Sequence, residues 1–176
     1  MTLEQRINQT IRDIPDFPKP GILFKDITPV LEDAVLSKDI VEHFAQKLKP
    51  LKLDAIVGVE SRGFLFGMPI AIALQIPFIT VRKKGKLPYK TVSYKYDLEY
   101  GSAEVEMHVD SIKPNWKVLV HDDLLATGGT ATAAAELIRM QGGQVAGFAF
   151  LVELSFLAGR QKLEKYSGNI INLVAF

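Results

Sequence analysis

Two adjacent carboxylates and a loop of small residues carry the clearest chemistry in the sequence. Asp122 and Asp123 end an apolar run, and a helical, alanine-rich run follows the loop, which consists of Ala126, Thr127, Gly128, Gly129 and Thr130. Loop N–H groups at the positive end of a helix dipole can bind an anion without a basic side chain. Gly128 and Gly129 permit backbone angles that a Cβ forbids, and Thr130 is a candidate helix cap. Because carboxylates suit sugar hydroxyls or hydrated Mg²⁺, the stretch suggests a phosphorylated sugar as ligand.

A second polar segment follows an apolar run earlier in the chain. Residues 53–59 predict a buried strand, and a helix is expected over 64–76. Between them lie Glu60, Ser61 and Arg62. Arg62 at a helix start is well placed to hold a second phosphate. The alternative is a loop arginine that only pairs with a carboxylate.

A third strand, residues 76–81, runs directly into a basic loop. Its cations are Arg82, Lys83, Lys84 and Lys86. A charge run is usually a solvated face, but glycine and proline here also predict mobility. Since ligands of open α/β sheets bind at the carboxyl ends of strands, a lid over a polyanion is a competing interpretation.

The remaining pattern supplies the elements that must position these loops. Helices are expected over residues 2–14, 40–48 and 155–166, and strands over 145–154 and 169–176. Period-2 alternation over 91–109 predicts an antiparallel hairpin that places Glu104, Glu106 and His108 on a wet face. We predict an α/β fold with an open, mostly parallel sheet flanked by helices, and a hairpin and flexible-loop excursion.

Two segments stay open to two interpretations each. Residues 16–31 contain three prolines and a glycine among apolar side chains, so they form either a structural brace or a rigid pocket wall with Phe24 as a stacking surface. The loop 97–101 carries Glu99, which is either a turn carboxylate or an acid group brought over a bound substrate. His121 precedes the acidic pair and is expected to pack beside the sheet.

Length and composition exclude several classes of protein. The 176 residues suit one domain, and the formal net charge of +1 gives no electrostatic reason to expect a nucleic-acid partner. There is no cysteine, and the three histidines lack zinc-site spacing. No apolar run is long enough to span a membrane. We therefore expect one cytoplasmic domain over residues 1–176, with an N-terminal hood at 1–35 and a flexible catalytic loop at 82–101.

Taken together, these segments resemble a known family. The run VLVHDDLLATGGTATAAAEL is similar to the phosphoribosyl-pyrophosphate (PRPP) signature of type I phosphoribosyltransferases. Other segments resemble the adenine-specific members of that family: DFPKPGILFKDITPVL, ESRGFLFG, RKKGKLP, LEYGSAEVE and LVELSFLAGR. The resemblance spans residues 13–160 and implies phosphoribosyl transfer from PRPP to adenine, giving AMP and pyrophosphate. It also implies Mg²⁺, held mainly by PRPP and water rather than directly by the protein, and a homodimer.

The resemblance further implies roles for individual residues. Asp122 and Asp123 lie near the ribose hydroxyls, and the loop from Ala126 to Thr130 holds the 5-phosphate. Ser61 and Arg62 belong to a pyrophosphate loop with a cis peptide bond between residues 60 and 61. The basic loop, through Arg82, Lys83 and Lys86, reaches the pyrophosphate of the neighbouring subunit.

The implied adenine site draws on three other segments. Phe24 stacks on the base, main-chain groups of Leu23 and Lys25 bind its edge, and Leu154 lies on the opposite face. Glu99 is the acid group near purine N7, and Tyr100 adjoins it in the closing lid. Two positions depart from the family pattern: Lys25 stands where arginine is frequent, and His121 replaces an aliphatic residue.

Three alternatives remain at this point. An enzyme specific for another base, such as xanthine or orotate, would keep residues 122–130 but would differ near residues 23–25 and 154. A PRPP-binding regulator would be expected to carry an added basic DNA-binding segment, for which residues 1–14 are too short. A dinucleotide-dependent enzyme is disfavoured because no GxGxxG follows a strand, and a P-loop is excluded because GK[ST] is missing.

Overall fold

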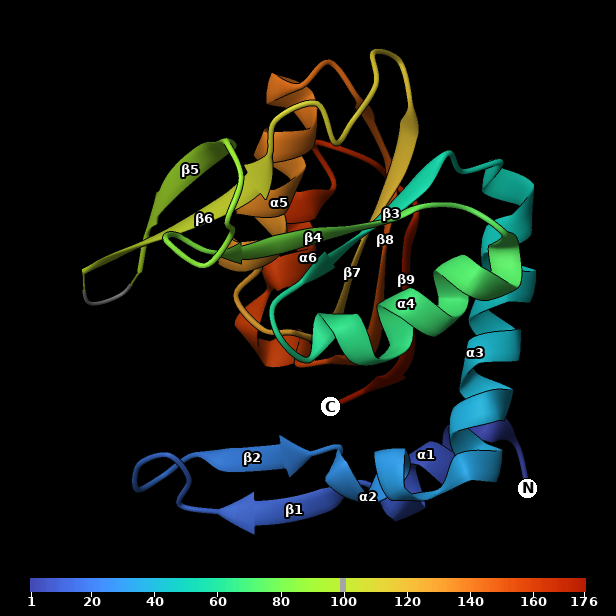
Figure 1. Ribbon diagram of the computed structural model, residues 1–176. Helices are drawn as coiled ribbons and strands as arrows, with labels where there is room; N and C mark the ends of the chain where they lie inside the picture. The colour runs from blue at the N-terminus through green and yellow to red at the C-terminus, as the bar shows by residue number, and fades with distance from the viewer. Residues whose placement is uncertain (99–100) are drawn as a thin grey trace.

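The computed structural model describes residues 1–98 and 101–176, which build a seven-stranded sheet in the order β5-β6-β4-β3-β7-β8-β9 (Figure 1). Five neighbouring strands are parallel: β4 (Phe78–Lys83), β3 (Ala55–Val59), β7 (Lys117–Leu125), β8 (Gln144–Glu153) and β9 (Ile170–Ala175). The hairpin of β5 (Thr91–Asp97) and β6 (Ser102–His108) adds an antiparallel edge through β6 and β4. The predicted fold class is confirmed.

Helices cover both faces of this sheet and create two apolar cores (Figure 1). On one face, α5 (Gly129–Met140) and α6 (Gly159–Leu163) pack against Val57 and Val120. On the other face, α3 (Ala34–Leu48) and α4 (Gly63–Leu74) pack against Ile56 and Leu119. Successive residues of β3 and of the first half of β7 thus enter opposite cores, which explains why these stretches are apolar on both faces.

The strand register brings the polar loops to one edge of the sheet. Val59 at the end of β3 pairs with Val81 of β4, and Gly58 pairs with His121 of β7. Residues 60, 82 and 122 therefore lie near one another at this edge of the sheet, although β4 and β7 continue to Lys83 and Leu125. This common edge is the one at which ligands bind in open α/β sheets.

The N-terminal segment forms a hood beside this edge of the sheet (Figure 1). It contains α1 (Leu3–Thr10), the hairpin of β1 (Arg12–Pro15) and β2 (Leu23–Asp26), and α2 (Thr28–Glu32). A capping box between Thr2 and Gln5 begins α1. The predicted helix over 2–14 is too long, because Ile14 lies in the hairpin and pairs with Phe24.

Two other predicted boundaries differ from the structure. The helix α3 begins after the cap Asp33, whose Oδ1 accepts a hydrogen bond of 2.9 Å from the Leu36 N–H. The single helix expected over 155–166 is instead a 3₁₀ turn, Ser155–Leu157, followed by α6. Ala158 separates them with a φ of 53°, which an α-helix cannot accommodate.

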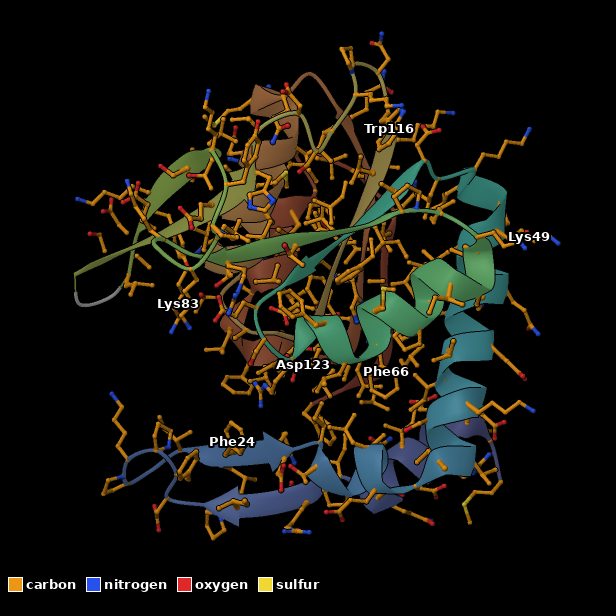
Figure 2. All side chains as sticks on the ribbon, in the orientation of Figure 1. Phe24, Lys49, Phe66, Lys83, Trp116 and Asp123 are labelled. Carbon is orange, nitrogen blue, oxygen red and sulfur yellow. The ribbon has the colours of Figure 1, made fainter. Side chains whose placement is uncertain are left out.

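The only tryptophan of the sequence, Trp116, lies directly before β7 and far from Asp123 near the other end of that strand (Figure 2). Lys113 Nζ is 5.3 Å from the centroid of its ring. Among the helices of residues 1–98 and 101–176, none is long and apolar enough to cross a membrane.

Candidate active site

The acidic pair lies inside β7 rather than after it. The strand continues to Leu125, and Asp122 pairs with Phe150 of β8. Burial raises the pKa of Asp122 well above its usual range, and the neighbouring Asp123 carboxylate raises it further. Burial also raises the pKa of Asp123, although the nearby Arg62 opposes this shift. The fold therefore disfavours ionisation of the pair, and Arg62 compensates only part of this cost.

Arg62 connects the acidic pair to the hood. It is the N-cap of α4, and its Nε lies 3.0 Å from Asp123 Oδ2. Its guanidinium carbon is 5.6 Å from the centroid of the Phe24 ring, a distance at which a cation is attracted to an aromatic face. The preceding peptide bond, between Glu60 and Ser61, is cis, as the resemblance implies. One arginine thus contacts both the Asp123 carboxylate and the predicted stacking surface.

A cavity of about 390 Å³ opens where the three loops meet. Its walls combine cations, carboxylates and one hydroxyl: Glu60, Ser61, Arg62, Lys83, Lys86, Asp122 and Asp123. The structure thereby brings together residues predicted from three separate segments of the sequence. Cationic side chains in a water-accessible cavity favour a polyanionic ligand.

The glycine loop forms a second, smaller cavity of about 70 Å³. Residues 124–131 line it together with Asp122, which therefore borders both cavities. Gly128 caps α5 with a φ of 79°, and a Cβ there would lie 2.8 Å from the Gly159 carbonyl oxygen. Both the backbone angle and the close approach of Gly159 require glycine at this position.

Thr130 does not cap the helix, contrary to prediction. The cap position belongs to Gly128, so Thr130 lies inside the first turn of α5. Its Oγ1 is 3.2 Å from the Tyr96 hydroxyl, which joins the glycine loop to the β5–β6 hairpin. The sequence pattern does not reveal this role of Tyr96, because the contact joins residues distant in the sequence.

The basic loop folds back onto a carboxylate of its own chain. Lys86 Nζ lies 2.5 Å from Glu60 Oε1, and Arg82 Nε lies 3.2 Å from Glu60 Oε2. The Lys83 N–H donates to the same oxygen at 3.0 Å. These hydrogen bonds, acting against burial, lower the pKa of Glu60 to about 2. Arg82 is absent from the cavity lining described above, whereas Lys83 and Lys86 are part of it.

Glu106 anchors the same loop from the other side and is not on a wet face as predicted. Its side chain is 3% exposed. Oε1 accepts hydrogen bonds from the N–H groups of Gly85 and Leu87 at 3.1 and 3.0 Å, and Oε2 accepts one from the Thr91 hydroxyl. The period-2 pattern indicated the correct face of the hairpin, but the basic loop itself covers that face.

The residues predicted for a base come from the hood and from the end of β8. Phe24 lies on β2, across from Asp123 in Figure 2. Leu154 follows β8, where its N–H donates to the Leu125 carbonyl at 2.9 Å. The Lys25 side chain is occupied elsewhere: Nζ lies 2.6 Å from Asp13 Oδ1 and 3.9 Å from the Phe176 ring centroid.

Comparison with known proteins identifies the family. Residues 30–173 match the family described as "Phosphoribosyl transferase domain". An adenine phosphoribosyltransferase of Cytophaga hutchinsonii is 52% identical over 174 residues, which cover 99% of this chain and 96% of that protein. The chain belongs to the adenine phosphoribosyltransferase family. This level of identity over nearly the full length of both proteins confirms the resemblance found in the sequence.

Solved adenine phosphoribosyltransferases share the fold. The crystal structure from Thermoanaerobacter pseudethanolicus has a TM-score of 0.94 and 51% identity, covering 99% of this chain and 100% of that one. The Saccharomyces cerevisiae enzyme has a TM-score of 0.91 and 38% identity, covering 97% and 98%. That enzyme was solved in complex with adenine and an imino-altritol bisphosphate.

Two residues with predicted roles in the adenine phosphoribosyltransferase lid, Glu99 and Tyr100, lie outside the described residues. Their roles remain predictions. Within the described parts of the chain, no three or more histidine or acidic side chains are grouped so that they could hold a metal ion.

His121 is buried between α3 and α4, as expected. Its ring meets the Phe44 ring edge-on at 5.7 Å, and it is fully shielded from solvent. Burial lowers the pKa of His121 to about 4, so the imidazole is neutral at neutral pH. Its carbonyl oxygen would lie 2.9 Å from a Cβ at Gly63, so the backbone of β7 touches the start of α4 here.

Proposed function

We propose that the chain transfers the 5-phosphoribosyl group of PRPP to adenine, giving AMP and pyrophosphate. The observation that carries this proposal is the position of Asp122, which borders both the glycine-loop cavity and the cationic cavity. A ribose placed beside this carboxylate would extend its 5-phosphate into one cavity and its pyrophosphate into the other. The yeast relative was solved with adenine and with a bisphosphate of a sugar-like ring, which correspond in kind to the two proposed substrates.

The 5-phosphate would bind to backbone groups. The loop 126–130 contains no charged side chain, and it precedes the twelve-residue helix α5. Unpaired N–H groups at the start of a helix point at an anion, and the helix dipole favours its negative charge. The hydroxyls of Thr127 and Thr130 would add donors on the same side.

The pyrophosphate would bind to side-chain cations. Arg62, Lys83 and Lys86 line the larger cavity together with the Ser61 hydroxyl. Breaking the bond from C1 to the pyrophosphate oxygen places negative charge on the leaving group. Cations already fixed around that position stabilise this charge without reorganisation, which is the largest contribution in many enzymes.

The ribose would meet Asp122 and Asp123. Their carboxylates accept hydrogen bonds from hydroxyls and would stabilise the positive charge that builds on the ring as the leaving group departs. Burial opposes ionisation of both groups, and Arg62 is the cation beside Asp123. Ribose hydroxyls donating to these carboxylates would favour their ionised form.

Mg²⁺ would be held mainly by the phosphates of the substrate and by water. Mg²⁺ dehydrates reluctantly and usually binds substrate phosphates while it keeps several waters. Its chemistry here would be to neutralise charge on the departing pyrophosphate. The donor set fits this mode of binding, because Asp122 and Asp123 present hard oxygen atoms at the wall of the cavity. They would accept hydrogen bonds from the waters of the ion.

Adenine would bind between the hood and the sheet. The Phe24 ring would stack on one face of the base and Leu154 would contact the other. Main-chain groups of Leu23 and Lys25 would bind the edge of the base. The Lys25 ammonium contacts Asp13 and Phe176, so it does not depend on the base. Lysine in place of the family's frequent arginine therefore leaves the main-chain groups of residue 25 able to bind adenine.

A homodimer would place apolar side chains of α4 at its interface. Leu65, Met68 and Ile72 are exposed on this helix, and Leu65 also lines a mainly apolar groove that α4 forms with α3. The groove has a volume of about 560 Å³. Exposed apolar patches of this kind mark contact sites. The contribution of Arg82, Lys83 and Lys86 to the neighbouring active site remains a prediction, tested by sedimentation and by mixing two inactive variants.

One assay tests the proposed function. The protein is mixed with Mg²⁺ and PRPP, each nucleobase is offered separately, and pyrophosphate release is measured with nucleotide formation. We expect turnover with adenine. Activity with hypoxanthine or orotate alone would overturn the base assignment, and tight PRPP binding without turnover would indicate a regulator.

The role of Glu99 is tested separately. Glu99→Gln keeps the size of the side chain but removes its ability to hold a proton at purine N7. We expect turnover to fall more than adenine affinity. Unchanged turnover would contradict a catalytic role for this residue.

A further inference from the structure

Glu60 collects the positive charge of the basic loop, although the proposed reaction gives it no role. Lys86 and Arg82 both form ion pairs with it, and the Lys83 N–H donates to it. The Glu60 side chain is only 9% exposed. A carboxylate with so many partners at the end of β3 is the main counter-charge that holds this loop.

The same carboxylate lines the cationic cavity. Lys83 and Lys86 are two of the three cations that a pyrophosphate in this cavity would use. Glu60 already pairs with the Lys86 ammonium, whereas it accepts only the backbone N–H of Lys83. Two anions that share the same cations compete for them, and they also repel each other at short range. The Glu60 carboxylate therefore pairs with a lysine that the pyrophosphate leaving group would also need.

The loop has a second anchor that does not depend on its cations. Glu106 holds the N–H groups of Gly85 and Leu87 on the opposite side of the loop. Loss of the Glu60 charge would release the cations while the backbone stays tethered. The two acidic residues therefore differ, because Glu106 holds the loop through its backbone, whereas Glu60 also holds the charged side chains of Arg82 and Lys86.

We propose that Glu60 is a positioning residue that keeps the basic loop at the cavity mouth and competes with pyrophosphate for Lys86. This inference rests on the proposed function. Its consequence is that Glu60 limits the affinity for pyrophosphate and returns the cations to their resting position when the product leaves. The ligand class is a magnesium-bound diphosphate.

Glu60→Gln tests the competition, because it removes the charge and keeps one oxygen to accept from the Lys83 N–H. Titration calorimetry with pyrophosphate and Mg²⁺ requires no turnover. We expect the Kd to fall about tenfold, the scale of one nearby unit charge removed from a partly solvated site. The rate of pyrophosphate release, followed by stopped flow, should fall by a similar factor.

Glu104→Gln is the matched control. Glu104 also pairs with a cation of this loop, since Lys84 Nζ lies 2.6 Å from its Oε1, but neither residue lines the cavity. We expect the Kd for pyrophosphate to stay within about twofold of the original protein, because exposed ion pairs contribute little. If the Kd for pyrophosphate fell equally in Glu60→Gln and Glu104→Gln, the change in net charge alone would explain it, and the proposal would be overturned.

A second variant separates charge from shape. Glu60→Asp keeps the charge, so its Kd should remain closer to the original protein than to Glu60→Gln. Unchanged or weaker binding by a Glu60→Gln protein with an unaltered melting temperature would overturn the proposal. This result is independent of AMP synthesis by the original protein, whose absence would instead reject the proposed function.

Discussion

The two strand–loop–helix junctions of the site prepare for an anion by different means. The junction from β3 to α4 contains Glu60 and Arg62, and both side chains are already paired within the chain. The junction from β7 to α5 has no charged residue between Ala126 and Thr130 and depends on backbone geometry. The β3–α4 junction would bind an anion through charged side chains that are already paired within the chain. The β7–α5 junction would bind one through its backbone N–H groups and the dipole of α5.

This difference suits the two ends of the proposed substrate. The 5-phosphate keeps its charge through the reaction, so a fixed backbone cradle is sufficient for it. The pyrophosphate gains charge and then leaves, so cations that can exchange between the ligand and protein carboxylates suit it better. The comparison predicts that variants of the first junction affect charge-dependent steps, while variants of the second affect geometry.

The largest expected effect comes from removing the charge of the first junction. Arg62→Gln leaves Asp123 buried without its cation and removes a contact to the leaving group. We expect kcat/KM to fall by about 10²–10³-fold in steady-state assays. Arg139→Gln is the control, since Arg139 is an exposed arginine on α5 that pairs with Glu136 and Tyr166 and does not line the cationic cavity. Activity within about threefold for Arg62→Gln would break the comparison, because the lost cation should cost far more.

The next effect concerns His121, where the two junctions touch. Its pKa in the folded protein, about 4, lies below the usual value of 6.5, so the unfolded chain binds more protons between these values. Stability should therefore fall as the pH drops from 6.5 to 4, by about 3 kcal/mol for this group. His121→Leu should lose this acid sensitivity in urea unfolding measured across that range. An identical pH dependence in both proteins would contradict the assignment.

Gly128→Ala tests the geometry of the second junction. A Cβ here is strained by the positive φ and meets the Gly159 carbonyl, so α5 and the loop must shift. We expect the KM for PRPP to rise about tenfold, because a displaced backbone cradle loses contacts with phosphate.

Gly21→Ala is the control for this glycine. Gly21 has a similar φ of 87°, but a Cβ there has no atom within 4 Å. It should lose only the left-handed backbone preference, about 1 kcal/mol, without a change in KM. Equal effects on KM in both variants would show that the contact with Gly159 is unimportant.

Asp122→Asn is expected to give the smallest effect on stability. It should raise the melting temperature slightly while it weakens PRPP binding. The raised pKa of Asp122 means that the folded state disfavours the ionised form, so this group costs stability as the pH rises through its folded pKa. Asn removes that cost, and we expect the melting temperature at about pH 8 to rise by about 2–4 °C. The gain should shrink as the pH is lowered towards the usual pKa of an aspartate, while productive PRPP binding weakens. A lower melting temperature for the variant in the alkaline range would show that the charge stabilises the fold.

The local pattern of the sequence was sufficient to predict the fold class and most of the site lining. Asp122, Arg62 and the loop to Thr130 lie at strand–helix junctions, and parallel strands bring such junctions to one edge. The β1–β2 hairpin was missed because each strand has four residues and three prolines interrupt the pattern.

Long-range partners were the part that the sequence could not supply. Alternation placed Glu106 on one face of its strand, but only the folded position of residues 84–91 shows that this face is covered. Likewise, the pairing of Glu60 with Arg82 and Lys86 depends on the path of a loop with no regular structure. Neighbouring residues in the sequence thus indicate the kind of ligand a loop can bind, but not the distant residues with which its side chains pair.

The place of Trp116 has a practical consequence for all of these measurements. As the single tryptophan, it dominates intrinsic fluorescence, and it lies at the opposite end of β7 from the acidic pair (Figure 2). Its emission should report whether the central sheet is folded and should be nearly silent to ligand binding. The protein therefore carries a built-in optical reference, against which changes at the site can be separated from loss of the fold.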